Sequence, residues 1–180
     1  LGYFSMNIME WKINKSAKGC VVCEKDFCEE EEYFSALFDE NNIFTRKDFC
    51  IACWRNNMEG GHFSFWKTKK PKSDKPARKF ININVLLDMF GRLEGKEEAR
   101  QKNLRYVLAL YLIRKKIFKL RSLSKQNGEE VITTYYPKED REFTVTNMNL
   151  KEEEIEAITS EMCQLLNYPD MELDALNNSL

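Results

Sequence analysis

Short apolar runs separated by turn residues fill the first 66 positions of the chain. Residues 32–38 alternate and predict a strand, residues 39–42 predict a turn, and residues 43–45 begin a returning strand. Alternation at residues 62–66, behind two glycines, predicts a last strand, and Trp11 with Ile13 predicts a first one. The pattern therefore indicates a β-rich N-terminal module over residues 1–66.

Helical spacing of apolar residues begins after residue 80. The stripe from Ile83 to Leu93 predicts one helix, and a second helix, apolar on two sides, is predicted from about Lys96 to Arg121. Residues 131–136 and 141–146 predict a β-hairpin near 130–146. A last helix is predicted after Asn149, and Pro169 ends it. We therefore expect a mainly helical module with one hairpin over residues 80–166.

Residues 67–79 differ in composition from both neighbours. They contain seven basic residues, one acidic residue and two prolines, and they lack any large apolar side chain. Such a segment is typical of an extended linker. The expected order is a module over 1–66, a basic linker over 67–79, a helical module over 80–166 and an acidic tail over 167–180.

Two cysteine pairs in the N-terminal module point to a metal site. Cys20 and Cys23 form one pair and Cys50 and Cys53 form the other, each with two intervening residues. A tight turn at each pair aims both sulfurs at one point, and four thiolates suit tetrahedral Zn²⁺. The alternatives are four buried small hydrophobes or two labile disulfides. A module of this size has little core, which favours a structural zinc.

Cys28 and His62 are further candidates near this site. Cys28 could replace a ligand or stay a free thiol, and a packing or surface position without a role is favoured. His62 is the single histidine, and an ordinary surface or half-buried position is favoured for it. Cys163 lies beside an apolar stripe and is interpreted as packing.

The paired cysteine turns linked by hairpins resemble the zinc-ribbon class. The whole layout, in which Cys53 is followed by Trp54 and then by a basic linker and a helical module, also resembles small bacterial proteins of uncharacterised function. Together with the predicted elements, this resemblance leads us to expect an α+β fold with an N-terminal β-rich zinc ribbon, a basic linker and a C-terminal mainly helical module with one β-hairpin. It implies no activity and therefore assigns no functional residue.

Charge is strongly segregated along the chain. Residues 1–66 have 7 basic and 11 acidic side chains, residues 67–125 have 18 and 5, and residues 126–180 have 3 and 13. A basic middle segment is typical of proteins that bind a phosphate backbone. The alternative is that the acidic last third neutralises it within the fold. The candidate polyanion-binding residues are Lys67, Lys69, Lys70, Lys72, Lys75, Arg78, Lys79, Arg114, Lys115, Lys116, Lys119 and Arg121.

Motifs for catalysis are missing from the sequence. It has no phosphate-cradling glycine loop and no nucleophile elbow, and one histidine cannot build the usual histidine-based metal centres. We therefore expect a non-enzymatic zinc-binding adaptor that contacts RNA, DNA or a ribonucleoprotein through its basic middle segment. The alternatives are a protein–protein interaction platform or a thiol-based redox switch. No membrane segment, secretion signal or small-molecule substrate is inferred, and a cytoplasmic location is expected.

Overall fold

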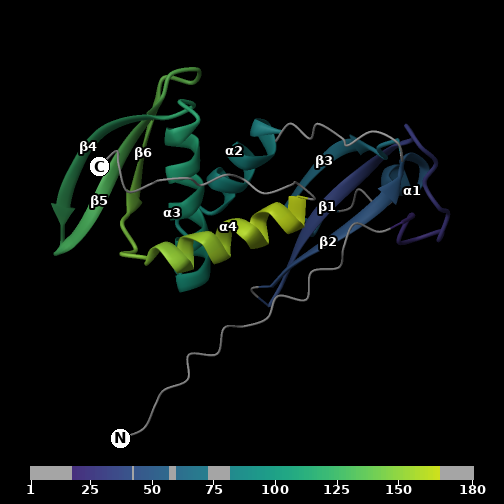
Figure 1. The fold of residues 1–180 in the computed structure, drawn as a ribbon, viewed down its shortest axis with the longest axis horizontal. Coiled ribbons are helices and arrows are strands. Elements are labelled where there is room, and N and C mark those ends of the chain that lie inside the picture. The colour runs from purple at the N-terminus through teal and green to yellow at the C-terminus, as the bar shows by residue number, and fades with distance from the viewer. Residues whose placement is uncertain (1–17, 42, 57–59, 73–81, 167–180) are drawn as a thin grey trace, which may run out of the picture.

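The computed structural model describes residues 18–41, 43–56, 60–72 and 82–166. Two antiparallel sheets of three strands lie at opposite ends of the described fold, and three helices lie between them (Figure 1). Trp11, Ile13 and the acidic tail predicted over 167–180 fall outside the described residues. No helix in the described part of the chain is long and apolar enough to cross a membrane.

The first sheet has the strand order β2-β1-β3. Strand β1 spans Glu32–Glu40, β2 spans Ile43–Cys50 and β3 spans Ser64–Lys69, and the short helix α1 follows β2 directly over Ile51–Asn56. Asn41 adopts a positive φ of 56° in the β1–β2 turn, which Asn tolerates better than most residues. The predicted hairpin is confirmed, and β3 continues through Lys67 and Lys69 into the segment predicted to be linker.

The second sheet has the order β4-β5-β6, with β4 over Lys119–Gln126, β5 over Glu129–Tyr136 and β6 over Arg141–Thr146. Asn127 and Gly128 join β4 to β5, and both have positive φ, as a tight two-residue hairpin turn requires. The predicted hairpin corresponds to β5 and β6. A third strand, β4, pairs with β5 where the second helix was expected to end.

The expected fold class is therefore wrong in its division of the chain. The fold is a mixture of α and β, but strands occur along the whole chain rather than in an N-terminal β-rich module followed by a mainly helical one. Helix α3 ends at Arg114, and Lys116 takes a left-handed φ of 58° that turns the chain into β4. All eight residues of β4 are exposed, so its sequence lacks the buried alternation that identifies a strand.

The remaining helices are α2 over Ile83–Arg92, α3 over Ala99–Arg114 and α4 over Glu152–Leu166. The side chain of Asn82 caps α2 by accepting from the backbone N–H of Asn84. Residues 106–112 of α3 are all buried, because α2, α4 and β6 pack around this helix. A double-sided apolar helix was predicted to be central, and α3 occupies that position (Figure 1).

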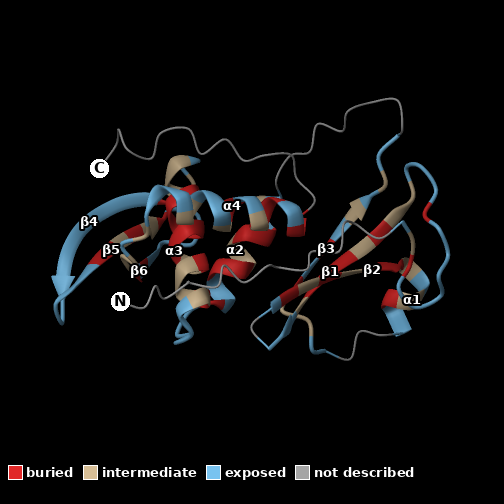
Figure 2. Ribbon diagram, turned by 60° about the horizontal axis from the view of Figure 1, so that its bottom comes forward, coloured by how far each residue is buried: buried red, intermediate tan, exposed pale blue. Residues whose placement is uncertain are grey.

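One buried apolar cluster extends from the first sheet into the helices and the second sheet. Leu37, Phe44 and Trp66 of the first sheet belong to the same cluster as Leu86, Leu108 and Phe143. Buried residues accordingly occur along β1 and β2 and in the helices in the middle of the molecule (Figure 2). This cluster leaves two parts of the first sheet outside it: the cysteine end and the outer face.

Candidate metal centre

The first cysteine pair lies at the tip of a small hairpin. The backbone of Phe27 donates to the carbonyl of Lys18 at 3.1 Å, and that of Cys20 donates to the carbonyl of Lys25 at 2.9 Å. Gly19 bridges Asp26 across this hairpin. A Cβ atom on Gly19 would lie 2.4 Å from the Lys25 carbonyl oxygen, so only glycine permits this close approach.

The second pair lies where β2 becomes α1. Cys50 is the last residue of β2 and Cys53 is the third residue of α1. The backbone N–H of Cys53 points back at the Cys50 sulfur, with a nitrogen–sulfur distance of 3.4 Å. The change from strand to helix thus brings both sulfurs of this pair to one side.

The two turns meet because the first one is hydrogen-bonded to β2. The backbone N–H of Val21 donates to the carbonyl of Asp48 at 2.9 Å. The sulfurs of Cys20, Cys23, Cys50 and Cys53 consequently all lie within 4.8 Å of one another. The Cys23 and Cys50 sulfurs are 3.9 Å apart. Four thiolates around one tetrahedral zinc at the usual bond length would be about 3.8 Å apart. The four cysteines can therefore hold a metal ion.

The pKa values of two thiols in the cluster, those of Cys20 and Cys53, are shifted in opposite directions. Burial opposes ionisation of Cys20, but backbone hydrogen bonds at Cys23, Cys50 and Val22 outweigh it and lower the pKa of this thiol to about 6. The hydrogen bond with Cys50, followed by desolvation, raises the pKa of the Cys53 thiol to about 12. Loading a metal onto these residues must therefore release protons.

The surroundings of the site are apolar on one side and open on the other. Phe27 and Tyr33 are both buried, and their rings stack at a centroid distance of 4.3 Å beside Cys20 and Cys50. Val21 and Val22, at the tip of the first turn, are exposed. The site is thus packed against buried aromatic rings on one side and open to solvent at the tip of the first turn.

The other cysteine and histidine candidates lie outside the cluster. Cys28 is exposed and its backbone N–H donates to Glu31, while Cys163 is buried among the helices. The His62 ring packs on Trp54 and Phe65, at centroid distances of 5.6 and 5.0 Å. Among the described residues, the converging group of metal-ligating side chains consists of the two cysteine pairs.

The structure separates the candidate polyanion-binding residues into two groups. Lys67 and Lys69 lie on β3, with Lys70 and Lys72 just beyond it, whereas Arg114, Lys115, Lys116, Lys119 and Arg121 lie at the end of α3 and on β4. These elements are at opposite ends of the molecule (Figure 1). Lys75, Arg78 and Lys79 fall outside the described residues. The described members of the set therefore lie on two separate surfaces.

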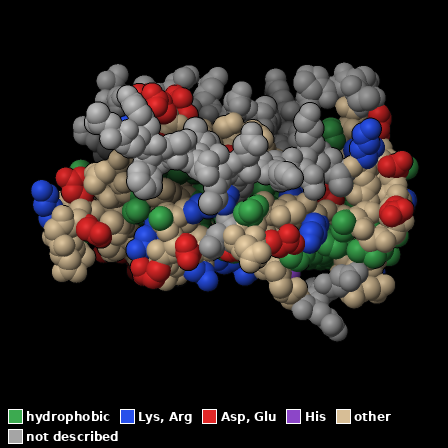
Figure 3. All heavy atoms as spheres, turned by 90° about the horizontal axis from the view of Figure 1, so that it is seen from below, with side chains coloured by type: hydrophobic (Ala, Val, Ile, Leu, Met, Phe, Trp, Pro, Cys, Tyr) green, Lys and Arg blue, Asp and Glu red, His purple; other side chains and the backbone are tan. Residues whose placement is uncertain are grey.

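Sequence reasoning missed the aromatic residues on the outer face of the first sheet. Phe34 stacks on Trp54 of α1 at 5.0 Å, and Phe65 packs on the same ring at 5.1 Å. Phe65 remains 41% exposed. Hydrophobic side chains gather at this end of the molecule (Figure 3). The regular alternation of Phe34 and Phe38 with buried residues in β1 was the signal that this strand has two apolar faces.

Sequence reasoning also missed a buried ion pair on the inner face of the same sheet. Arg46 and Asp48 are both buried and lie 2.9 Å apart, and the hydroxyl of Ser35 donates to Asp48 at 2.6 Å. The available signal was the spacing of Phe44, Arg46 and Asp48, which are two residues apart in one strand. Residues at this spacing share a face, so the two charged side chains lie on the core side with Phe44.

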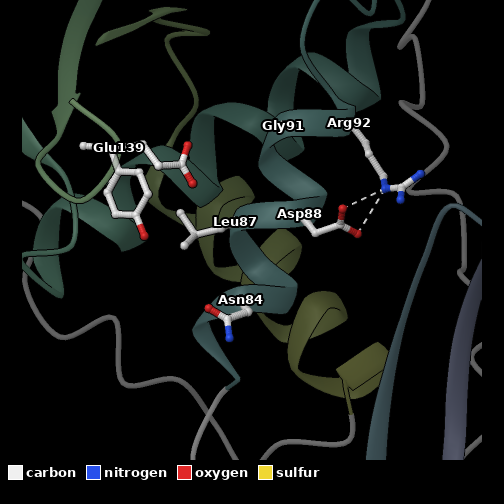
Figure 4. A pocket seen from close by; sticks show the side chains of 7 residues that line it. Asn84, Leu87, Asp88, Gly91, Arg92 and Glu139 are labelled. Atoms are coloured by element: carbon white, nitrogen blue, oxygen red, sulfur yellow. Dashed lines mark hydrogen bonds and ion pairs between the residues drawn. The ribbon is translucent and has the colours of Figure 1, made fainter. Parts of the chain in front are cut away.

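A shallow depression beside α2 is lined by Asn84, Leu87, Asp88 and Glu139 among others (Figure 4). The carboxylate of Asp88 is held by Arg92 at 2.9 Å and by the Ser64 hydroxyl at 2.7 Å. The carboxylate is thus engaged in structural contacts, and the lining offers no cysteine or histidine nucleophile.

No family model, curated protein or solved structure matches the chain.

Proposed function

We propose that the chain is a zinc-stabilised, non-enzymatic binding protein that takes up single-stranded nucleic acid on the outer face of its first sheet. The observation that supports the zinc is the convergence of four cysteine sulfurs within 4.8 Å. Four thiolates fill a tetrahedral shell and leave no position for a substrate, which is typical of structural zinc. Such sites contribute about 10–16 kcal/mol of apparent binding free energy to folding.

The proposed role of the metal is to hold the first hairpin against β2. Apart from the zinc, the described backbone contact that joins the Cys20 turn to this strand is the bond from Val21 to Asp48. The metal would add two covalent links on each side. It would thereby also fix α1, whose Trp54 covers the aromatic residues of the outer face.

The proposed nucleic-acid surface combines flat rings with positive charge. Phe34, Phe65 and Lys67 share the outer face, because Phe34 lies opposite Lys67 in the β1–β3 register and Phe65 lies two residues before it. Toward β2 on the same outer face, the ammonium of Lys47 lies 4.7 Å from the Phe38 ring centroid. Phe65, which is 41% exposed, is the ring on which a base can stack whatever its sequence, since Phe34 is already stacked on Trp54, while the lysines contact the backbone.

Acidic residues on this face do not prevent binding. Glu32 pairs with Lys67 and Lys69, and Glu40 pairs with Lys47, but every partner is substantially solvent-exposed. Exposed pairs of this kind contribute about 0–1 kcal/mol each, so a phosphate can replace the carboxylate. The described members of the predicted basic segment that support the proposal are therefore those on β3.

Metal analysis tests the zinc. The purified chain is expected to contain one zinc, to lose it in Cys50→Ser, and to keep it in the matched control Cys28→Ser. Full zinc retention in a Cys20→Ser, Cys50→Ser double variant would contradict the assignment. Iron, which accepts the same four thiolates, would be recognised by its visible absorption.

Fluorescence anisotropy with a labelled oligo-uridine tests the nucleic-acid surface. Phe65→Ala is expected to weaken binding by about 1–3 kcal/mol, and Phe65→Tyr, which keeps the ring, is expected to restore it. If three lysines contact phosphates, the log–log salt slope should be about −2. Lys67→Gln removes a charge from the face and should weaken binding. Lys138→Gln removes a charge away from the face and is its matched control. Equal binding by all four variants would contradict the proposal.

A further inference from the structure

Strand β4 is an edge strand that the other described elements leave uncovered. It pairs with β5 on one side, and all eight of its residues are exposed (Figure 2). Leu123 is 59% exposed and Leu120 is 40% exposed. An edge of this length with apolar side chains is a template for pairing with another strand.

The two leucines face the same side as the core. Leu123 lies opposite Ile132 and Leu120 lies opposite Thr134, and both of these β5 residues are buried. The helices cover β5 and β6 but leave β4 exposed. A depression of about 410 Å³ results on this side, and its apolar wall includes Tyr106, Leu123 and Ile132.

The charge carried by β4 itself is positive, although Glu129, Glu130 and Glu142 lie on the neighbouring strands. The segment from Arg114 to Gly128 has six basic residues and no acidic one. Within β4, Arg121 stacks on the Tyr135 ring at 4.3 Å and lies 3.9 Å from Glu142, whereas Lys119 and Lys125 flank the two leucines. Pairing of two copies along this edge would bring two such basic strands side by side, and like charges on neighbouring strands are destabilising. The charge therefore disfavours a second copy and favours an acidic strand.

We infer that the free edge of β4 binds an extended acidic segment of a partner protein, which adds as a fourth strand to the second sheet. Backbone hydrogen bonds along the edge supply affinity, and alternate side chains supply specificity. Carboxylates on one face of the segment meet Lys119, which lies opposite Tyr135, and apolar residues on its other face cover Leu120 and Leu123. A phosphate backbone makes no apolar contact with leucine side chains. The binding inferred at this edge therefore differs from the nucleic-acid binding proposed for the outer face of the first sheet. The inference is independent of the proposed zinc and nucleic-acid binding.

A fluorescein-labelled peptide in which glutamate alternates with valine tests the inference on the full chain. Leu123→Ser is expected to weaken binding about tenfold, since it removes much of the apolar contact. Ile43→Ser, an equally simple change of an exposed apolar residue in the first sheet, is the matched control and should bind as the parent does. The Lys119→Glu, Lys125→Glu double variant should lose the peptide.

A second peptide, N-methylated at alternate amides, separates strand addition from simple charge attraction. It should not bind, because its methyl groups block the backbone ladder. Equal binding of both peptides would overturn the inference, as would unchanged binding by Leu123→Ser. Three other results would overturn it by identifying another occupant. These are a dimer that Leu123→Ser dissociates, displacement of the peptide by oligo-uridine, and peptide binding that appears only after residues 168–180 are deleted.

Discussion

The guanidinium of Arg46 donates to the backbone carbonyl of Leu165 across a nitrogen–oxygen distance of 3.3 Å, although 119 positions separate them in the chain. Leu165 lies in the last turn of α4, where carbonyl groups have no partner within the helix. The same guanidinium contacts Asp48 and Ser35, at 2.9 Å each. One buried side chain thus connects β2, close to the cysteine end, with the end of the last helix.

Arg46→Met is expected to lower the free energy of unfolding by about 3–5 kcal/mol. The change leaves the buried carboxylate of Asp48 without its cation, and an uncompensated buried charge has a cost of this size. The double variant Arg46→Met, Asp48→Asn should recover part of the loss. Urea denaturation at neutral pH measures both values. A loss below about 1 kcal/mol in the single variant would show that the pair is not desolvated as the structure indicates.

Gly19→Ala is expected to weaken metal binding and to destabilise the protein by about 1–3 kcal/mol. The new methyl group would meet the Lys25 carbonyl at 2.4 Å, and the turn that presents Cys20 must open to relieve the contact. Gly91→Ala is the matched control. A methyl group there meets nothing within 4 Å on the exposed side of α2, so a small gain of up to about 1 kcal/mol is expected. Competition with a zinc chelator and thermal unfolding measure the two effects.

The site was more predictable than the fold because its signal is local. Two residues between the members of each cysteine pair indicate which cysteines come together, and the β1–β2 hairpin that joins the pairs has its own turn residues. The approach of the Cys20 turn to β2 depends on the bond from Val21 to Asp48. That contact links positions with no pattern in common, so the sequence could predict which four cysteines converge but not how the two turns meet.

The end of α3 shows why the division of the chain was mispredicted. Ile117 and Phe118 continue the apolar spacing of the helix, and no glycine or proline interrupts it before Gly128. The chain nevertheless leaves the helix at Lys115, and Phe118 enters the core among Phe90 and Phe143. Tertiary packing of one aromatic ring therefore outweighed local helical preference. Strand β4, fully exposed, offered no alternation to correct the error.

Phe118→Ala is expected to destabilise the protein by about 3–5 kcal/mol, since the ring is 1% exposed and touches Phe90, Tyr136 and Phe143. Leu120→Ala, two residues further along the chain and 40% exposed, should cost less than about 1 kcal/mol. Chemical denaturation of the two variants provides the comparison. Similar losses in both would show that β4 is packed more deeply than the structure indicates.

Glu161 supplies a pH-dependent contribution to stability. It is half-buried on α4, and desolvation raises the pKa of its carboxyl to about 7, although the charge of Arg100 on α3 acts in the opposite direction. In the unfolded chain the same carboxyl titrates near its ordinary value of about 4.3. Between these two values the folded protein binds more protons than the unfolded chain.

The free energy of unfolding should therefore fall as pH rises from about 4.5 to about 7, and it should be flat with respect to this group above that range. Because the carboxyl is only half-buried, the loss should be about 1–2 kcal/mol rather than the full value of the shift. Glu161→Gln removes the titration, so the variant should match the parent near pH 4.5 and exceed it near pH 8. Urea denaturation of both proteins at a series of pH values gives the difference, in which contributions from groups that the two proteins share cancel. A difference that stays constant with pH would contradict the raised pKa, whereas a growing deficit of the variant at high pH would show that the Glu161 carboxylate stabilises the fold through Arg100.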